Sequence, residues 1–126
     1  MTLVLDAGAF VALERNERAM WVRLKAAQLA AAPPVTHGGV LAQVWRGGSG
    51  RQVLLARALA AVEVAPLDEE VGRRAGVLLA RSGLDDAIDA AVAALADHGD
   101  AILNSDPGDL SLLVAASRRR VDVIPV

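Results

Sequence analysis

Asp85–Ala96 (DDAIDAAVAALA) and Ala101–Leu110 (AILNSDPGDL) are the two adjoining stretches that decide the fold of this chain. The first stretch predicts a helix that is apolar almost all round from residue 87 to residue 96, and such a helix is normally buried. Asp89 is the one charged residue inside that run, and a buried carboxylate is costly unless something compensates its charge. The second stretch predicts a short apolar strand that runs directly into two more aspartates, Asp106 and Asp109.

The composition predicts a single domain over residues 1–126, long enough to bury roughly two-thirds of its unfolded surface. The chain is 54% hydrophobic with a formal net charge of −2, so a packed core is expected and disorder is not. No apolar run approaches the ~18 residues of a membrane span, and no charged-then-apolar leader opens the chain. The absence of cysteine fits a reducing compartment. We therefore expect a cytosolic protein without a membrane partner.

Apolar runs and turn residues predict alternating strands and helices. The predicted strands cover residues 2–5, 35–36, 62–65, 101–103 and 121–124. The predicted helices cover residues 7–13, 17–31, 40–46, 52–60, 68–81, 85–98 and 110–118. Thr36 and Ser49 are candidate N-caps, and Ser82-Gly83-Leu84-Asp85 has the spacing of a capping box. This alternation predicts an α/β fold with a parallel sheet of about five strands.

Acidic residues from remote parts of the chain are expected to meet at one edge of that sheet. The first strand ends in Asp6, just as the fourth leads into Asp106. In open parallel sheets, sites form beyond the carboxyl ends of the strands, so these two carboxylates meet if the first and fourth strands are neighbours. Asp89 lies on the preceding helix, three residues after Asp86, and Asp109 has the same spacing from Asp106. Such carboxylates are the hard oxygen ligands that Mg²⁺ or Mn²⁺ prefers.

Each of these acids also has a purely structural interpretation. Asp6 fits an N-cap, and Asp85 fits a capping role better than a ligand role. Asp86 fits a first-turn acid that the helix dipole favours, and the sequence from Asp106 to Asp109 resembles a turn. For Asp89, which we place beyond the first turn of its helix, the alternative is an ion pair with a distant arginine.

The two histidines have no His or Cys neighbour at ligand spacing. His37 is therefore expected to be a solvated loop residue, and His98 a cation at a helix end.

Four blocks of sequence resemble the PIN domain family, and within it the VapC-like toxins of type II toxin–antitoxin systems. These blocks are Leu3–Ala9 (LVLDAGA), Val40–Gly48 (VLAQVWRGG), Asp86–Ala90 (DAIDA) and Ile102–Leu110 (ILNSDPGDL). The resemblance implies a three-layer α/β/α fold and an endoribonuclease that cleaves structured RNA, such as transfer or ribosomal RNA, by metal-activated water. It also implies a homodimer and a cognate antitoxin that covers the site.

The resemblance further implies roles for particular acids. Asp6, Asp89 and Asp106 match the family's metal-binding acids and are the expected catalytic ligands. Asp86 matches a supporting acid at the metal, and Asp109 one that assists catalysis, each directly or through water.

Gln43 departs from the family pattern, which has a glutamate at this position. A neutral amide removes a full negative charge, so affinity for Mg²⁺ or Mn²⁺ should fall. Three interpretations follow: a weakened nuclease, an inactive PIN module that binds RNA or a partner protein, or an engineered substitution. A phosphatase or phospho-acceptor domain is disfavoured because the only lysine, Lys25, is expected in the middle of a helix rather than at a strand end.

Overall fold

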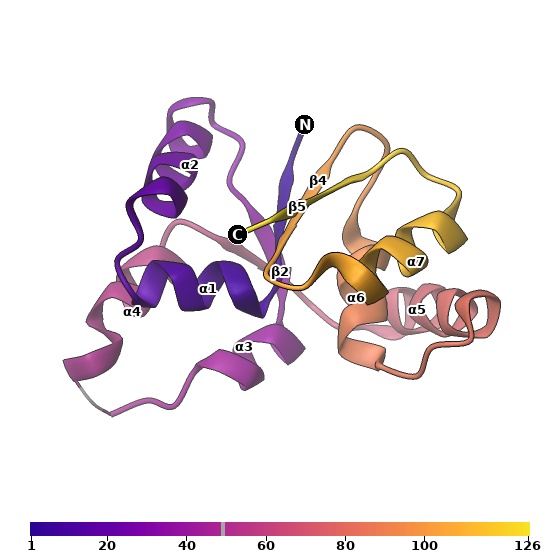
Figure 1. Cartoon of the computed structure of the whole chain (residues 1–126). Coiled ribbons are helices and arrows are strands. Elements are labelled where there is room, and N and C mark those ends of the chain that lie inside the picture. The colour runs from indigo at the N-terminus through magenta and orange to yellow at the C-terminus, as the bar shows by residue number, and fades with distance from the viewer. Residues whose placement is uncertain (49) are drawn as a thin grey trace.

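A five-stranded parallel sheet forms the centre of the molecule, with helices packed on both of its faces (Figure 1). The structure, a computed structural model, describes residues 1–48 and 50–126. The strands are β1 (Leu3–Leu5), β2 (Val35–His37), β3 (Glu63–Ala65), β4 (Ala101–Asn104) and β5 (Asp122–Pro125). The helices are α1 (Ala7–Glu14), α2 (Arg18–Leu29), α3 (Gly38–Val44), the 3₁₀ turn η1 (Gly50–Gln52), α4 (Val53–Leu59), α5 (Glu69–Ser82), α6 (Ala87–Leu95) and α7 (Pro107–Ser117).

The strand order is β3-β2-β1-β4-β5, and every pair is parallel. β1 therefore lies in the middle with β4 beside it, as the sequence argument requires. Figure 1 shows the first four helices on one side of the sheet and α5, α6 and α7 on the other, which makes three layers. The predicted α/β/α architecture with a parallel sheet is thus confirmed.

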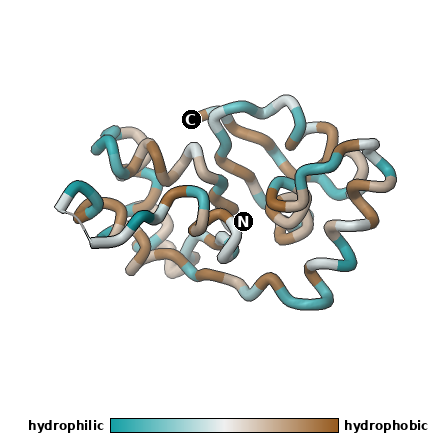
Figure 2. Tube along the Cα trace, turned by 90° about the horizontal axis from the view of Figure 1, so that it is seen from below, coloured by the Kyte–Doolittle hydropathy of each residue, from teal (hydrophilic) through white to brown (hydrophobic). Residues whose placement is uncertain are grey.

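The core fills both spaces between the sheet and its helices. Leu5, Ile102 and Leu103 of the central strands are fully buried, as are Phe10 and Leu13 of α1. Strands that are apolar on both faces are typical of a parallel sheet that is covered on both sides. Figure 2 shows hydrophobic and hydrophilic residues alternating along much of the trace. Within the described residues, no helix is long and apolar enough to cross a membrane.

The helix that carries Asp89 is shorter than the sequence predicts. Gly83 ends α5 in a left-handed conformation (φ 75°), and the Ser82 hydroxyl accepts the Leu84 N–H instead of capping the next helix. Asp86 is the N-cap of α6, so the capping box that we expected at Ser82 and Asp85 is wrong.

The other end of α6 also differs from the prediction. The helix ends at Leu95 rather than near residue 98. The Asp100 carboxylate accepts the N–H groups of both Asp97 and Thr2, and these bonds shape the turn that follows the helix. His98 lies in that turn, where its Nδ1 accepts the Arg120 N–H, so its predicted place at the end of the helix is wrong.

The caps around α3 differ as well. Thr36 lies within β2 and donates its hydroxyl to the Leu5 carbonyl at 2.8 Å, so it ties two strands together and caps no helix. His37 is the N-cap of α3. The predicted cap Ser49 lies outside the described residues.

Candidate functional site

A polar cleft of about 430 Å³ opens at the carboxyl edge of the two central strands, at the lower end of the sheet in Figure 1. Its walls come from the ends of β1 and β4 and from the starts of the helices around them. The residues that line it are Asp6, Ala7, Gly8, Gln43, Asp89, Asn104, Ser105, Asp106 and Asp109. Six positions were singled out from the sequence as site residues. Five of them line this cleft, and the sixth, Asp86, lies outside the lining. The five are Asp6, Gln43, Asp89, Asp106 and Asp109.

Asp6 is the most deeply buried acid of the cleft, with 5% of its surface exposed. Its Oδ2 accepts a hydrogen bond from the Asn104 side-chain amide. Its Oδ1 is buried and has no hydrogen-bond partner. Burial raises the pKa of Asp6, although the backbone N–H of Ala7 and the Asn104 amide act in the opposite direction. Asp6 stands at the N-cap position of α1 but makes no side-chain capping bond, so the capping interpretation does not explain it.

Gly8 allows the two strand ends to come this close together. A Cβ at Gly8 would lie 2.5 Å from the Ser105 Oγ and 2.6 Å from the Ser105 backbone nitrogen. A Cβ atom does not make non-bonded contacts this short, so a larger residue would push the start of α1 away from the loop after β4. The glycine thus sets the spacing between Asp6 and the acids that follow β4.

Asp89 projects from the first turn of α6, not from beyond it as we expected, because the helix begins at Ala87. The pKa of Asp89 is raised to about 6, chiefly by burial and then by the negative charges of Asp6, Asp86, Asp109 and Asp106, in that order of importance. None of the ion pairs in the described part of the chain includes Asp89, so the alternative of a distant arginine partner is wrong.

Asp86 acts as a capping residue. Its carboxylate accepts the N–H groups of Ile88 at 2.9 Å and Asp89 at 3.1 Å, so it fixes the first turn of α6. Asp85, which we expected to cap this helix, is exposed and not its cap. The charge of Asp86 still reaches the cleft, since it contributes to the raised pKa values of both Asp6 and Asp89.

The two acids that follow β4 are exposed at the mouth of the cleft. Asp106 is the N-cap of α7, with a long bond of 3.5 Å from the Gly108 N–H, and Asp109 lies in the first turn. Asp106, which we expected in a turn, therefore combines a capping role with a place in the lining of the cleft.

His37 is fully buried, so the prediction of a solvated loop residue is wrong. Its Nδ1 accepts the Gly39 N–H at 3.0 Å, and its Nε2 lies 3.1 Å from the Ile88 carbonyl. Because Nδ1 is an acceptor, the ring proton is on Nε2, which donates to Ile88. His37 thus links the start of α3 to the first turn of α6 and fixes the helix that carries Asp89.

Asn104 and Ser105 are site residues that the sequence argument did not single out. Asn104 orients Asp6 and also accepts the Asp106 backbone N–H through its Oδ1, so one buried amide connects both strand ends. The signal was present, because a polar residue at the end of an apolar strand, two residues before an acid, is unusual in a core. The hydrogen bond to Asp6 could not be predicted from the pattern, because the two residues are 98 positions apart.

The geometry provides a cluster of negative charge whose members repel one another. Among residues 1–48 and 50–126, no three His, Cys, Asp or Glu side chains already stand in an arrangement that would hold a metal ion. Like charges at short range separate when no cation lies between them, and their pKa values rise. The unpartnered Asp6 Oδ1 and the raised pKa of Asp89 are the two observations that fit a divalent cation.

Helix N-termini add the opposite electrostatic character to the same cleft. α1, α6 and α7 all begin at this edge of the sheet, next to Asp6, Asp86 and Asp106 respectively. The unpaired N–H groups of a first turn favour anions such as phosphate. A cation held by carboxylates and a phosphate near helix N-termini are therefore compatible in this cleft.

Comparison with known proteins adds two findings and one absence. The family model described as "PIN domain" matches residues 3–120. The crystal structure of VapBC2 from Rickettsia felis, bound to a DNA fragment from their promoter, contains a chain with the same fold. The TM-score is 0.72 at 14% sequence identity, with 98% of each chain covered. A search of curated proteins finds no match. Because the family model spans nearly the whole sequence, the chain belongs to the PIN domain family.

Proposed function

We propose that this PIN domain is an endoribonuclease that depends on Mg²⁺ or Mn²⁺ and serves as the toxin of a type II toxin–antitoxin pair. Its substrate class is structured RNA of the transfer or ribosomal type, and its compartment is the cytoplasm. The observation that carries the proposal is the meeting of Asp6, Asp89, Asp106 and Asp109 in one cleft of a PIN domain. Acids gathered from both ends of the chain serve no obvious packing purpose, whereas a cation would offset their repulsion.

The chain's own residues fit a divalent metal in a definite way. Asp6, Asp89 and Asp106 would hold it, with Asp6 Oδ1 as an oxygen that has no hydrogen-bond partner in the described part of the protein. When bound, such an ion lowers the pKa of a water molecule and neutralises charge that develops on a phosphodiester. Asn104 keeps the Asp6 carboxylate in one orientation. Asp109, exposed in the first turn of α7, is placed to accept a proton or orient a water at the mouth of the cleft.

Asp86 and the helix N-termini have supporting roles in this scheme. Asp86 holds the first turn of α6, so it positions Asp89, and it adds negative charge that strengthens cation binding. The starts of α1 and α7 lie where an RNA phosphate would reach the cleft, and their free N–H groups favour that anion. A site of this kind would recognise the shape and the phosphates of an RNA rather than particular bases, which suits a structured RNA substrate.

Gln43 is the feature that weakens the proposed enzyme. It is exposed on α3 and lines the cleft, so a glutamate there would add a fifth carboxylate to it. The amide offers one carbonyl oxygen and no charge. We therefore expect weak metal binding and slow turnover.

The decisive experiment is RNA-fragment mapping with purified protein and Mn²⁺, using transfer RNA and a ribosomal RNA fragment. Three proteins are compared with the wild type: Asp89→Asn, Gln43→Glu and the control Asp122→Asn, which changes an exposed acid on β5 far along the sheet from the cleft. Defined cleavage that is lost in Asp89→Asn, kept in Asp122→Asn and increased in Gln43→Glu supports the nuclease. Equal cleavage by wild type and Asp89→Asn would refute the assignment.

The second candidate is a PIN module that binds RNA or a partner protein without cleaving it. The neutral residue at position 43 favours it, because this is the position where the family pattern has an acid. If neither the wild type nor Gln43→Glu cuts any RNA while both are folded and bind RNA, this second function is the correct one.

The expected partners are a second copy of the chain and an antitoxin. The structural neighbour comes from a complex that its title names VapBC2, which supports a partner protein for this chain as well. Light scattering on the purified chain tests the homodimer. Purification from its own cells with a tag on this chain tests the antitoxin, since a small partner at a constant ratio is expected.

A further inference from the structure

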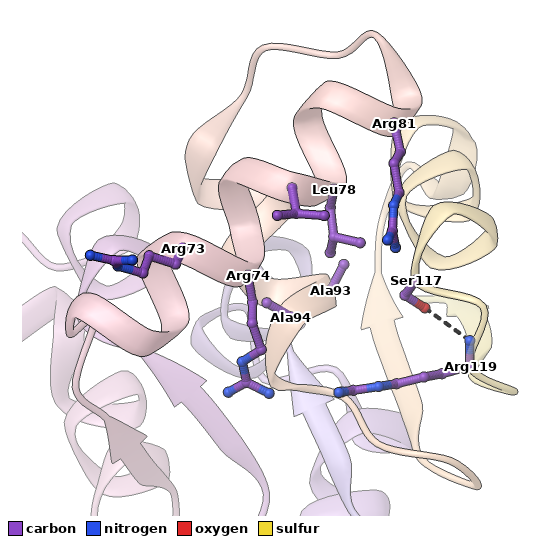
Figure 3. Close-up of a pocket in the computed structure, with 9 residues that line it drawn as sticks. Arg73, Arg74, Leu78, Arg81, Ala93, Ala94, Ser117 and Arg119 are labelled. Atoms are coloured by element: carbon purple, nitrogen blue, oxygen red, sulfur yellow. Dashed lines mark hydrogen bonds between the residues drawn. The ribbon is translucent and has the colours of Figure 1, made fainter.

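A second hollow lies at the opposite ends of α6 and α7, away from the acidic cleft (Figure 3). It has a volume of about 270 Å³ and is bounded by α5, the last turns of α6 and the segment that follows α7. We call it the arginine groove. Its apolar surface comes from Val77, Leu78, Ala93 and Ala94.

Four arginines line the same groove, namely Arg73, Arg74, Arg81 and Arg119. In Figure 3 the side chains of Arg74 and Arg119 point toward one another across one mouth of the groove, and Arg81 descends between α5 and α7. Arg73 extends to the outer side of α5. The groove therefore combines an apolar floor with a cationic rim.

Helix-end chemistry explains two of these arginines. Arg81 donates to the Ala116 carbonyl at 3.4 Å, and Arg119 donates to the Ala96 carbonyl at 2.8 Å. A cation at a helix C-terminus is favourable because the last carbonyls are unpaired and the dipole is negative there. These two side chains are therefore held in place by the fold. Arg119 also pairs with Asp97 at 3.2 Å, but the Asp97 side chain is exposed, so this pair contributes little. Further N–H groups of each guanidinium have no hydrogen-bond partner among the described residues.

Arg74 has no such explanation. Its Nε is buried and has no hydrogen-bond partner among the described residues. Its ion pair with Glu70 is long, at 3.9 Å, and the Glu70 side chain is 79% exposed, so the pair contributes little. A buried donor without a partner costs free energy. The Arg74 side chain as a whole is 39% exposed, so the outer nitrogens of the same guanidinium are open to an acceptor from outside.

We propose that the arginine groove binds an acidic, amphipathic peptide segment of a partner protein. Apolar side chains of the segment occupy the floor formed by Leu78, Ala93 and Ala94, and its carboxylates pair with Arg74, Arg81 and Arg119. Guanidinium groups bind carboxylates through two parallel N–H bonds, which gives such a contact geometric specificity. RNA is the weaker candidate, because none of the residues that line the groove is aromatic and bases would have no stacking surface.

This surface is separate from the proposed nuclease site. Asp109 and Ser117 lie eight residues apart on α7, which corresponds to about 12 Å along a helix at ~1.5 Å per residue. Asp89 and Ala94 are likewise at different ends of α6. A peptide in the groove therefore leaves the acidic cleft open, and the inference does not depend on whether the chain cuts RNA.

The test uses a fluorescein-labelled synthetic peptide of about 12 residues, with leucine at helical spacing and glutamate or aspartate elsewhere. Fluorescence anisotropy measures its binding to the full chain, beside a peptide in which lysine replaces every acid. The variants are Arg74→Glu, the milder Arg74→Gln and Arg81→Glu. The matched control is Arg57→Glu, which changes an exposed arginine of α4. Circular dichroism melts establish that each variant is folded.

The expected result is binding that weakens with salt, absent for the lysine peptide and unchanged in Arg57→Glu. Arg74→Glu and Arg81→Glu should each weaken it about tenfold or more, and Arg74→Gln by a smaller factor, because each charge-assisted bond carries that much affinity. Equal binding to Arg74→Glu and Arg57→Glu, or no binding to the wild type, would overturn the proposal. So would a change of molecular mass in light scattering on Arg74→Glu, because the groove would then join two copies of this chain. RNA binding that is lost in the same variants would overturn it in favour of nucleic acid.

Discussion

Replacing Asp89 with asparagine should make the metal-free protein more stable while it removes an expected catalytic group. The pKa of Asp89 rises from 3.8 to about 6 on folding, because of burial and the neighbouring negative charges. A shift of about two units corresponds to ~3 kcal/mol between the charged and neutral forms. Asp89 is only half-buried, so solvent screening reduces this to roughly 1–2 kcal/mol.

One opposing effect enters the balance. Asp89 lies in the first turn of α6, where an acid interacts favourably with the helix dipole by about 0.3–1 kcal/mol. Asparagine loses that interaction. The net stabilisation expected at pH 8 is therefore about 1 kcal/mol, or a rise of ~3–4 °C in melting temperature for a domain of this size.

The sign of the pH dependence follows from linkage. The folded pKa lies above the unfolded value, so the folded state binds more protons between pH ~4 and pH ~6. The wild type is consequently favoured below pH 4, and it loses this contribution as the pH rises through 6. At pH 4.5 the Asp89 carboxyl is mostly protonated in the folded state, and the difference from asparagine should shrink toward zero.

Thermal unfolding in EDTA, followed by circular dichroism at pH 8.0 and pH 4.5, measures both values. Asp122→Asn serves as the control, because it removes an exposed acid outside the cleft and should leave the melting temperature unchanged at each pH. A lower melting temperature for Asp89→Asn at pH 8.0, or the same difference from wild type at both pH values, would contradict the mutual repulsion of these carboxylates.

Three further changes test the site and the interactions that support it. Gln43→Glu should tighten Mn²⁺ binding in calorimetry by roughly tenfold, because it adds a charge to the cleft, and equal affinities would remove position 43 from the site. Gly8→Ala should cost about 2–3 kcal/mol in urea unfolding, since its Cβ meets the Ser105 backbone at 2.6 Å, and a neutral effect would mean that α1 moves freely. His37→Ala should cost ~2–4 kcal/mol, because it leaves the Gly39 N–H and the Ile88 carbonyl without their partner and opens a cavity; full stability would show that this link is dispensable.

The hydrophobic periodicity of the sequence was sufficient to predict the order of the strands and helices along the chain. Leu3–Leu5 and Ala101–Leu103 are apolar without interruption, a pattern that predicts strands covered on both faces. Asp6, Asp89, Asp106 and Asp109 followed from where such strands and helices end. These inferences succeed because they depend on chain direction and on burial, which a sequence pattern expresses directly.

Element boundaries and caps were decided by longer-range contacts. α6 begins at Ala87 and not at residue 85, because Gly83 turns left-handed and Asp86 takes the cap. Thr36 has the chemistry of a cap, yet its hydroxyl bonds to Leu5, a residue 31 positions away. Local propensity cannot anticipate an acceptor that another strand supplies.

The sequence alone determined the α/β class, the parallel sheet and the identity of the acids that face its carboxyl edge, because residue type and spacing control which faces are buried. Only the tertiary structure decided what those acids experience. It buried His37 between α3 and α6, placed the Asn104 amide on Asp6, and left one oxygen of that aspartate without a partner. It also brought Arg74 of α5 and Arg119 of the segment after α7 to one groove. The physical reason is that desolvation and charge repulsion depend on distances in space between residues far apart in the chain.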